Sequence, residues 1–141
     1  MFEKILLATD GSSHAKRAAD AAIHLSKALT NVSVTLLHVS TAAPKRSELM
    51  TANFDVKSLL LEEAHQSISA TKQKFRSEGI PFKVEVALGD PAAEIVKRAE
   101  NGQYGLIIVG SRGLNRLSEV LLGSVSHQVV HEAKCPVMIV K

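Results

Sequence analysis

The sequence has little sulfur and few aromatic side chains, and each shortage excludes a class of protein. Cys135 is the only cysteine among 141 residues, so neither an internal disulfide nor a metal site built from several thiolates is possible. There is no tryptophan and one tyrosine, and the lysines and arginines are scattered along the chain. Nucleic-acid binding through a basic stripe with stacking aromatics is therefore not expected.

Long apolar runs are missing as well. No stretch approaches the about 18 residues that a membrane-spanning helix needs, so we expect no insertion into a membrane. The opening residues, MFEKILLATD, carry an acid before a short apolar run and lack the pattern of a secretion signal. With a net charge of only +3, these features predict a cytoplasmic protein.

What the sequence does have is a series of short apolar runs. Four are continuous, which is typical of parallel strands buried on both faces: 5–8, 32–39, 106–109 and 137–140. A fifth, 82–88, alternates more and predicts an edge strand. Because helical periods separate the runs, we expect one α/β domain over residues 1–141. It is Rossmann-like, a five-stranded parallel open sheet of order 3-2-1-4-5 with helices on both faces.

Two connections in this scheme are less regular. A helical period joins Leu61, Ala64, Ile68 and Phe75 on one face, which predicts one helix there. The stretch 40–56, STAAPKRSELMTANFDV, has no clear period. Because it is long for a connection in a compact domain, we expect a mobile flap or a disordered loop.

A glycine pattern follows the fourth strand. The apolar run 106–109 stops at Gly110, Gly113 comes three positions later, and Gly123-Ser124 opens the next predicted helix. Glycine lets bare backbone approach a ligand, and the free N–H groups at a helix start favour anions. In a sheet of this order, the first strand, which ends in Thr9-Asp10, lies beside the fourth. The pattern therefore predicts a phosphate site between these two strand ends.

At this point the chain resembles the universal stress proteins of the UspA family along essentially its whole length. The resemblance is carried by ILLATDGS at 5–12, His38-Val39, GSRG at 110–113, Gly123-Ser124 and CPVMIV at 135–140. The spacing G-x2-G-x9-G-(S/T) is unbroken here, which implies the ATP-binding branch of the family. Few lysines lie near this loop, so we expect Mg²⁺ or Mn²⁺ to accompany the triphosphate.

The resemblance also implies a role for each matching residue. Asp10 faces the ribose with Thr9 beside it, and Val39 lines the adenine. The residues expected around the nucleoside and the phosphates are Val109, Gly110, Gly113, Gly123, Ser124, Val125 and Ser126. The family forms homodimers, commonly through the last strand, which is Val137–Val140 here. An apolar edge strand of this kind needs a partner or a cover.

Each of these residues also has a purely structural interpretation. Asp10 is able to cap the next helix, although Ser12 is the better cap, and the glycines are able to serve a tight turn. Ser124 and Ser126 are common helix-start residues. Arg112 either neutralises the charge of the phosphates or is solvated at the surface, and the same two interpretations apply to Arg116.

Other candidate residues are weaker. Lys45 and Arg46 would reach a ligand only if the flap closed over it. His127 and His131 have the spacing of a metal pair, but the chain has no HExxH, so no protein-bound metal is expected. Cys135 is expected to be a buried apolar residue.

Four functions compete on this evidence. The first is an ATP-binding homodimeric regulatory or stress-response module with an unidentified protein partner, and the second a nucleotide-free dimeric adaptor of the same fold. The third, an efficient hydrolase or phosphotransferase, lacks a P-loop lysine and an evident base, so at most slow turnover is expected. The fourth, a phosphoacceptor receiver domain, lacks the acidic cluster after the first strand. The first is preferred.

Overall fold

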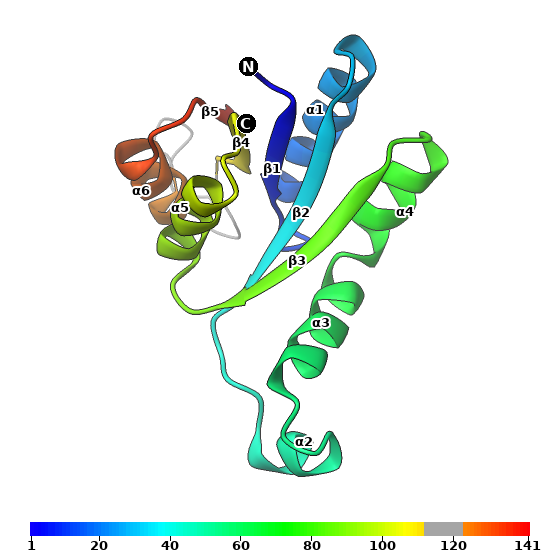
Figure 1. Ribbon diagram of the computed structural model, residues 1–141, viewed down its shortest axis with the longest axis vertical. Helices are drawn as coiled ribbons and strands as arrows, with labels where there is room; N and C mark the ends of the chain where they lie inside the picture. The colour runs from blue at the N-terminus through cyan, green and yellow to red at the C-terminus, as the bar shows by residue number, and fades with distance from the viewer. Residues whose placement is uncertain (112–122) are drawn as a thin grey trace.

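The strands lie in one parallel sheet whose order matches the predicted one. The computed structural model describes residues 1–111 and 123–141. The sheet runs β3-β2-β1-β4-β5 (Figure 1). Its strands are β1 (Lys4–Ala8), β2 (Ser33–Ser40), β3 (Phe82–Leu88), β4 (Leu106–Gly110) and β5 (Val137–Val140). The expected α/β fold and the edge position of the alternating run are confirmed.

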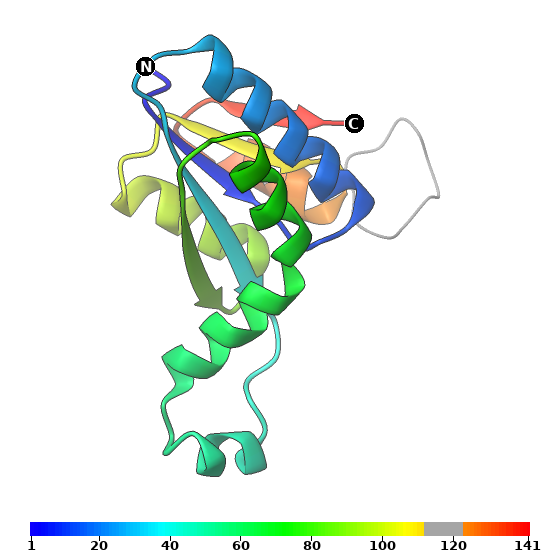
Figure 2. The ribbon, with the colours of Figure 1, turned by 90° about the vertical axis from the view of Figure 1, so that its right-hand side faces the viewer.

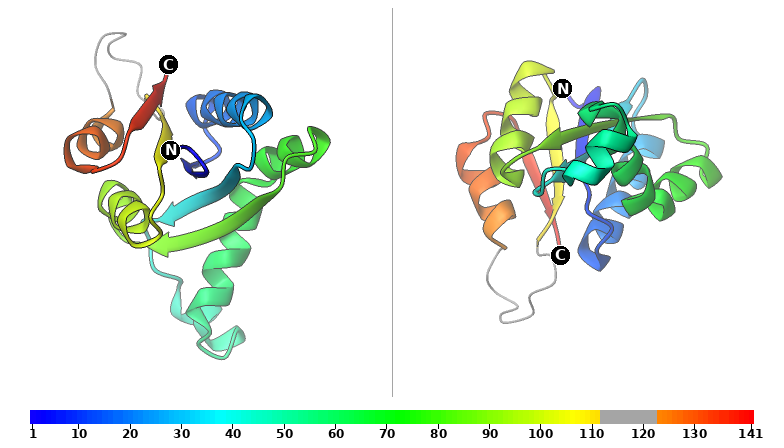
Figure 3. Two further views of the ribbon diagram at one scale, coloured as in Figure 1. Left: turned by 45° about the horizontal axis from the view of Figure 1, so that its top comes forward. Right: turned by 90° about the horizontal axis from the view of Figure 1, so that it is seen from below.

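Helices cover both faces of this sheet. Figure 2 shows α1 (Ser13–Ala28), α3 (Val56–Ser67) and α4 (Ser69–Ser77) in front of the sheet, and Figure 3 shows the same layers from two other directions. On the opposite face lie α5 (Pro91–Asn101) and α6 (Ser124–Glu132). The two faces carry separate apolar cores, one including Ile5 and Phe75 and the other including Leu6 and Val129.

The strand registers explain how the first and fourth strands meet. Leu7 pairs with Ile108 and Leu6 with Ile107, so β1 and β4 end side by side. On the other side of β1, Ala8 pairs with Leu37 of β2. The carboxyl ends of these three strands therefore meet at one edge of the sheet, where parallel α/β sheets bind ligands.

Of the two alternatives for 40–56, the disordered loop is wrong, because the segment contains regular secondary structure. β2 continues through Ser40, a helix α2 spans Arg46–Thr51, and α3 begins at Val56. The sequence shows no period here because α2 has six residues and none is buried. Together α2 and α3 form an arm, residues 45–67, whose α2 end projects away from the sheet (Figures 1 and 2).

Two smaller expectations also need correction. The single helix predicted through Leu61 and Phe75 is broken at Ile68, where φ is −111° and ψ is 20°, so the segment forms α3 and α4. The last strand is not buried on both faces. All four residues of Val137–Val140 are half-buried, because β5 forms the edge of the sheet and pairs only with β4.

Candidate functional site

A cavity of about 440 Å³ opens at the carboxyl ends of β1, β2 and β4. Its walls also include the starts of α1, α5 and α6. Cavities of about 300–1,000 Å³ are the size in which small ligands bind. The switch in strand order between β1 and β4 thus coincides with a cavity of ligand size.

Every predicted site residue in the described part of the chain lines this cavity. They are Thr9, Asp10, Val39, Val109, Gly110, Gly123, Ser124, Val125 and Ser126. Arg112 and Gly113, which were also predicted, lie outside the described residues, as does Arg116. Lys45 and Arg46, which were expected to reach a ligand only if the flap closed, are the N-cap and the first residue of α2. Neither lines the cavity.

The structure adds lining residues that sequence reasoning missed. They are Ala8, Ser12, Ala15, Leu37, Thr41, Pro91 and Ile95. Pro91 and Ile95 come from the start of α5, a helix that sequence reasoning did not connect with the site. The signal was present in the strand order: α5 leads from the edge strand β3 to β4, so it crosses above the ends of β2 and β1.

The turn after β1 positions Asp10. The Ser12 hydroxyl caps α1 by accepting from the N–H of Ala15 at 3.2 Å, as expected. Asp10 Oδ1 accepts from the N–H of Ser12 at 2.9 Å. Gly11 has φ +80°, and a Cβ there would lie 2.6 Å from the carbonyl oxygen of Ser67. Both the backbone angle and the contact with α3 require glycine, and the turn leaves Asp10 exposed at the cavity.

Packing against α1 also requires glycine at position 110. A Cβ at this position would lie 2.9 Å from the backbone carbon and oxygen of His14 and from its Cβ. Real side chains do not approach so closely. The first turn of α1 therefore sits against bare backbone at the end of β4, whatever the cavity binds.

The start of α6 presents backbone N–H groups without a side-chain cap. Gly123 is the N-cap residue, and the first helical bond runs from the N–H of His127 to Gly123 O at 2.9 Å. The N–H groups of the three residues between them have no acceptor within the helix. Since Ser124, Val125 and Ser126 all line the cavity, their N–H groups and the positive helix end favour an anion there.

The hydroxyl of Ser126 is engaged within the protein. Ser126 is buried. Its hydroxyl is the donor to two carbonyl oxygens, Ser111 O at 2.9 Å and Gly123 O at 3.0 Å. Ser111 O also accepts from the N–H of Gly123 at 2.6 Å. Ser126 thus closes the turn into α6 with its side chain and faces the cavity as an N–H donor. The hydroxyl of Ser124 is on an exposed residue.

One buried hydroxyl at the cavity lacks a partner. Thr9 is buried, and its Oγ1 makes no hydrogen bond to any described residue. The backbone of Thr9 is held on β2, since its N–H donates to Leu37 O at 3.0 Å. A buried polar atom left unpaired costs free energy, so Thr9 Oγ1 is a local cost among the described residues at the end of β1.

The remaining candidates take no part in this cavity. His127 and His131 are exposed on α6, and no cluster of three metal-ligating side chains occurs within residues 1–111 and 123–141. Cys135 lines a separate cavity of about 370 Å³ with Tyr104 and Val96. Burial raises the pKa of the Cys135 thiol, which disfavours the reactive thiolate.

None of the helices in the described ranges has the length and apolar character needed to cross a membrane.

The cavity lining contains no lysine or arginine among the described residues, and Asp10 is its only acid there. Among the described lining residues, the helix starts are therefore the groups that favour a negative charge.

Comparison with known proteins gives the same fold and a family. The universal stress protein YxiE of Bacillus subtilis is 36% identical, with both chains covered completely. The solved structure of MJ0577, whose sequence is from Methanocaldococcus jannaschii, has a TM-score of 0.78 at 35% identity, covering 100% of this chain and 96% of that one. A universal stress protein family protein from Arabidopsis thaliana, solved with AMP bound, has a TM-score of 0.68 at 21% identity, covering 98% and 90%.

The family model itself spans the full sequence. It is the model of the universal stress protein family, and it matches residues 1–141. The match includes both strand ends that form the cavity and the glycine-bearing segment between β4 and α6. This chain belongs to the universal stress protein family.

Proposed function

We propose that the chain binds an adenine nucleotide, ATP with Mg²⁺ or Mn²⁺ in the first place, in the cavity between β1 and β4. In this proposal it acts as a cytoplasmic homodimeric regulatory or stress-response module. The observation that carries the proposal is the uncapped first turn of α6, which lines the same cavity as Asp10 and an apolar wall. Such a helix start binds phosphate, and the neighbouring groups suit a nucleoside.

The cavity offers a separate surface for each part of a nucleotide. Leu37, Val39 and Ile95 form an apolar wall for the base. Asp10 accepts from Ser12 through Oδ1 and has Oδ2 available to accept from ribose hydroxyls. The N–H groups of Ser124–Ser126 face the phosphates. Thr9, Val109, Gly110, Arg112 and Gly113 complete the proposed set, the last two on sequence grounds alone.

The divalent ion would be held mainly by the phosphates. Asp10 is the single carboxylate lining the described part of the cavity, whereas a protein-built Mg²⁺ or Mn²⁺ site needs several oxygen ligands. When bound, the ion neutralises triphosphate charge that the described lining residues do not balance. Because the described lining residues include no lysine and no base other than Asp10, we expect at most slow hydrolysis.

Structural relatives supply the probes for testing this proposal. Proteins of the same fold were solved with AMP, cAMP and dAMP, at 21%, 23% and 21% identity to this chain. At these identities the likeness shows the fold alone. ATP, AMP and cAMP are therefore the ligands to compare first.

Two substitutions at Ser124 test the phosphate site. Ser124 is the first residue of α6, where proline is well tolerated but lacks the N–H donor. Ser124→Pro is expected to weaken ATP binding about tenfold or more, because one hydrogen bond to a charged group is lost. The matched control, Ser124→Ala, keeps the N–H and removes the hydroxyl only.

Isothermal titration calorimetry with MgATP measures both variants against the wild type. Equal affinity in Ser124→Pro and wild type would remove the helix start from the site, and absence of wild-type binding at millimolar ATP would contradict the proposal as a whole. Circular dichroism would establish that α6 is retained in both variants.

A second candidate function is the nucleotide-free dimeric adaptor. The observations in its favour are the Ser126–Ser111 hydrogen bond and the contact of Gly110 with His14, which give these motif residues structural roles without a ligand. The ligand-sized cavity and the N–H groups at the start of α6, which no described side chain caps, favour the nucleotide-binding function over this one.

A further inference from the structure

His38 lies one residue from the cavity but on the opposite face of the sheet. Along β2, Leu37 and Val39 pack with the core on the α5 side, whereas Val34 and Leu36 belong to the core on the α1 side. Because side chains alternate along a strand, His38 points to the same face as Leu36, toward α3. It is 7% exposed, so its ring is enclosed by protein.

The ring of His38 reaches the end of β1. Its Nδ1 lies 3.3 Å from the carbonyl oxygen of Thr9. A carbonyl oxygen only accepts, so Nδ1 carries the hydrogen and donates. The N–H of Thr9 already donates to Leu37 O. Both backbone groups of Thr9 are therefore tied to β2, and the peptide that leads into Asp10 is fixed in direction.

The other side of the same ring faces α3. Nε2 of His38 lies 3.8 Å from Glu63 Oε1, beyond hydrogen-bond distance, and because Nδ1 already carries a hydrogen the two groups attract each other only when the ring is doubly protonated. The Oγ of buried Ser40, two residues along β2, lies 3.1 and 3.3 Å from the Glu63 carboxylate oxygens and 3.1 Å from the carbonyl oxygen of Ala42, so these acceptors share its one hydrogen. Glu63 is half-exposed, so its charge is partly screened by water. Its contacts nevertheless hold α3 against the end of β2.

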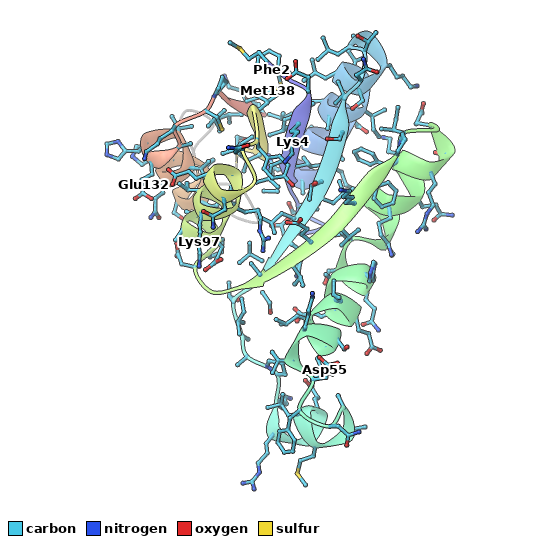
Figure 4. The ribbon with its side chains drawn as sticks, viewed as in Figure 1. Phe2, Lys4, Asp55, Lys97, Glu132 and Met138 are labelled. Carbon is cyan, nitrogen blue, oxygen red and sulfur yellow. The ribbon has the colours of Figure 1, made fainter. Side chains whose placement is uncertain are left out.

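The helix that carries Glu63 is the part of the arm next to the sheet. In Figure 4, Asp55 marks the start of α3 on the arm, well separated from labelled residues of the sheet such as Lys4 and Met138. α3 contacts the sheet through buried Leu60 and Ala64 and, at the end of β2, through Glu63. The next group in the chain of contacts is His38, and the one after it is Thr9.

We propose that His38 is a positioning residue for the cavity, and that Glu63 couples the seating of the α2–α3 arm to nucleotide binding through it. This inference rests on the proposed function. The coupling is reciprocal: whatever displaces α3 weakens nucleotide binding, and a bound nucleotide holds α3 more firmly on β2.

Conservative variants separate this role from simple packing. His38→Asn keeps an N–H donor near the position of Nδ1 and loses the contact with Glu63, and His38→Leu fills the space without a donor. We expect MgATP affinity about threefold weaker than wild type in His38→Asn, which loses only the Glu63 contact, and about fifteenfold weaker in His38→Leu, which also loses one neutral hydrogen bond.

Substitutions on α3 test the coupling. Glu63→Ala is expected to weaken MgATP binding about threefold, a small effect because the carboxylate is half-exposed. Glu62→Gln, at the exposed neighbouring position, is the control and leaves affinity unchanged. In the His38→Asn background, Glu63→Ala has no further effect on affinity, because the connecting ring is gone.

Two measurements on the ligand-free protein complete the test. Nitrogen NMR of the His38 ring is expected to show hydrogen on Nδ1, and amide exchange at Asp10–Ser12 is expected to be faster in His38→Leu but not in His38→Asn, with β4 unchanged. An Nδ1 without hydrogen, or wild-type exchange and affinity in His38→Leu, would overturn the proposal.

The two proposals fail in different ways. If the wild type binds no nucleotide, the proposed function and the coupling both fail, and the exchange data still decide whether His38 positions the Asp10 turn. If the wild type binds MgATP and Glu63→Ala binds equally well, the coupling alone is overturned.

Discussion

At the scale of single residues, Gly110 serves packing as well as the proposed ligand site. A Cβ would lie 2.9 Å from backbone atoms of His14. These atoms belong to α1, and α1 cannot move without disturbing the apolar core between it and the sheet. Gly110→Ala is therefore expected to lower the free energy of unfolding by about 1–3 kcal/mol, the usual cost of overpacking. Urea unfolding without nucleotide measures it. Unchanged stability in the ligand-free protein would mean that the glycine serves only ligand approach.

At the scale of elements, the start of α3 depends on one carboxylate. Asp55 accepts from the N–H of Ser58 at 3.1 Å and from its hydroxyl at 2.7 Å, and these bonds lower the pKa of Asp55 below its ordinary value. A lowered pKa stabilises the folded helix start above the unfolded pKa, and this contribution is lost as pH falls through the folded value.

Amide exchange at Ser58 measures that dependence. We expect its protection to fall on acidification in the wild type and to be insensitive to pH in Asp55→Asn, which keeps an oxygen acceptor without titrating. Asp55→Ala is expected to lose protection at every pH. Equal protection of Ser58 in wild type and Asp55→Ala at neutral pH would show that the cap contributes nothing to α3.

The edge strand β5 is the second element with a testable role. Ile107 N–H donates to Pro136 O and Ser111 N–H to Val140 O, so the N–H groups of Val137 and Ile139 point away from β4, toward the open edge. This edge is the dimer interface that we propose.

Proline at an outward-facing edge position removes a donor without breaking the sheet. Ile139→Pro is therefore expected to leave the fold intact and to convert the dimer to a monomer by light scattering. Val140→Pro, the control, removes an N–H that faces β4 and is expected to destabilise the fold. A dimeric Ile139→Pro, or a monomeric wild type, would contradict this interface.

At the scale of the whole molecule, local patterns predicted the strands, and topology then predicted where the site lies. Continuous apolar runs such as 106–109 need no distant information, and the order of strands follows from connection rules. Thr9-Asp10 and Gly123-Ser124 were predicted to lie together on that basis. The glycine-bearing segment predicted that the site binds an anion, and the strand order predicted where in the fold that site lies.

What sequence reasoning missed depends on contacts between distant segments. The need for glycine at position 110 comes from His14, and the enclosure of His38 comes from α3, neither of which shows in a local pattern. α2 was missed because a helix with no buried residue has no apolar period. Ile95 was missed because the crossover of α5 above β2 and β1, which the strand order implies, was not used to place it at the cavity.

The measurement that tests nucleotide binding most directly is an amide NMR titration of the wild-type protein with MgATP. Binding in the cavity predicts saturable shifts at Ser124, Val125 and Ser126, together with Asp10 and Val39, and little change near Cys135. GTP at the same concentrations is expected to produce weaker shifts if the apolar wall receives adenine. No saturable shift at millimolar MgATP, or shifts confined to the cavity beside Cys135, would contradict a nucleotide site between β1 and β4.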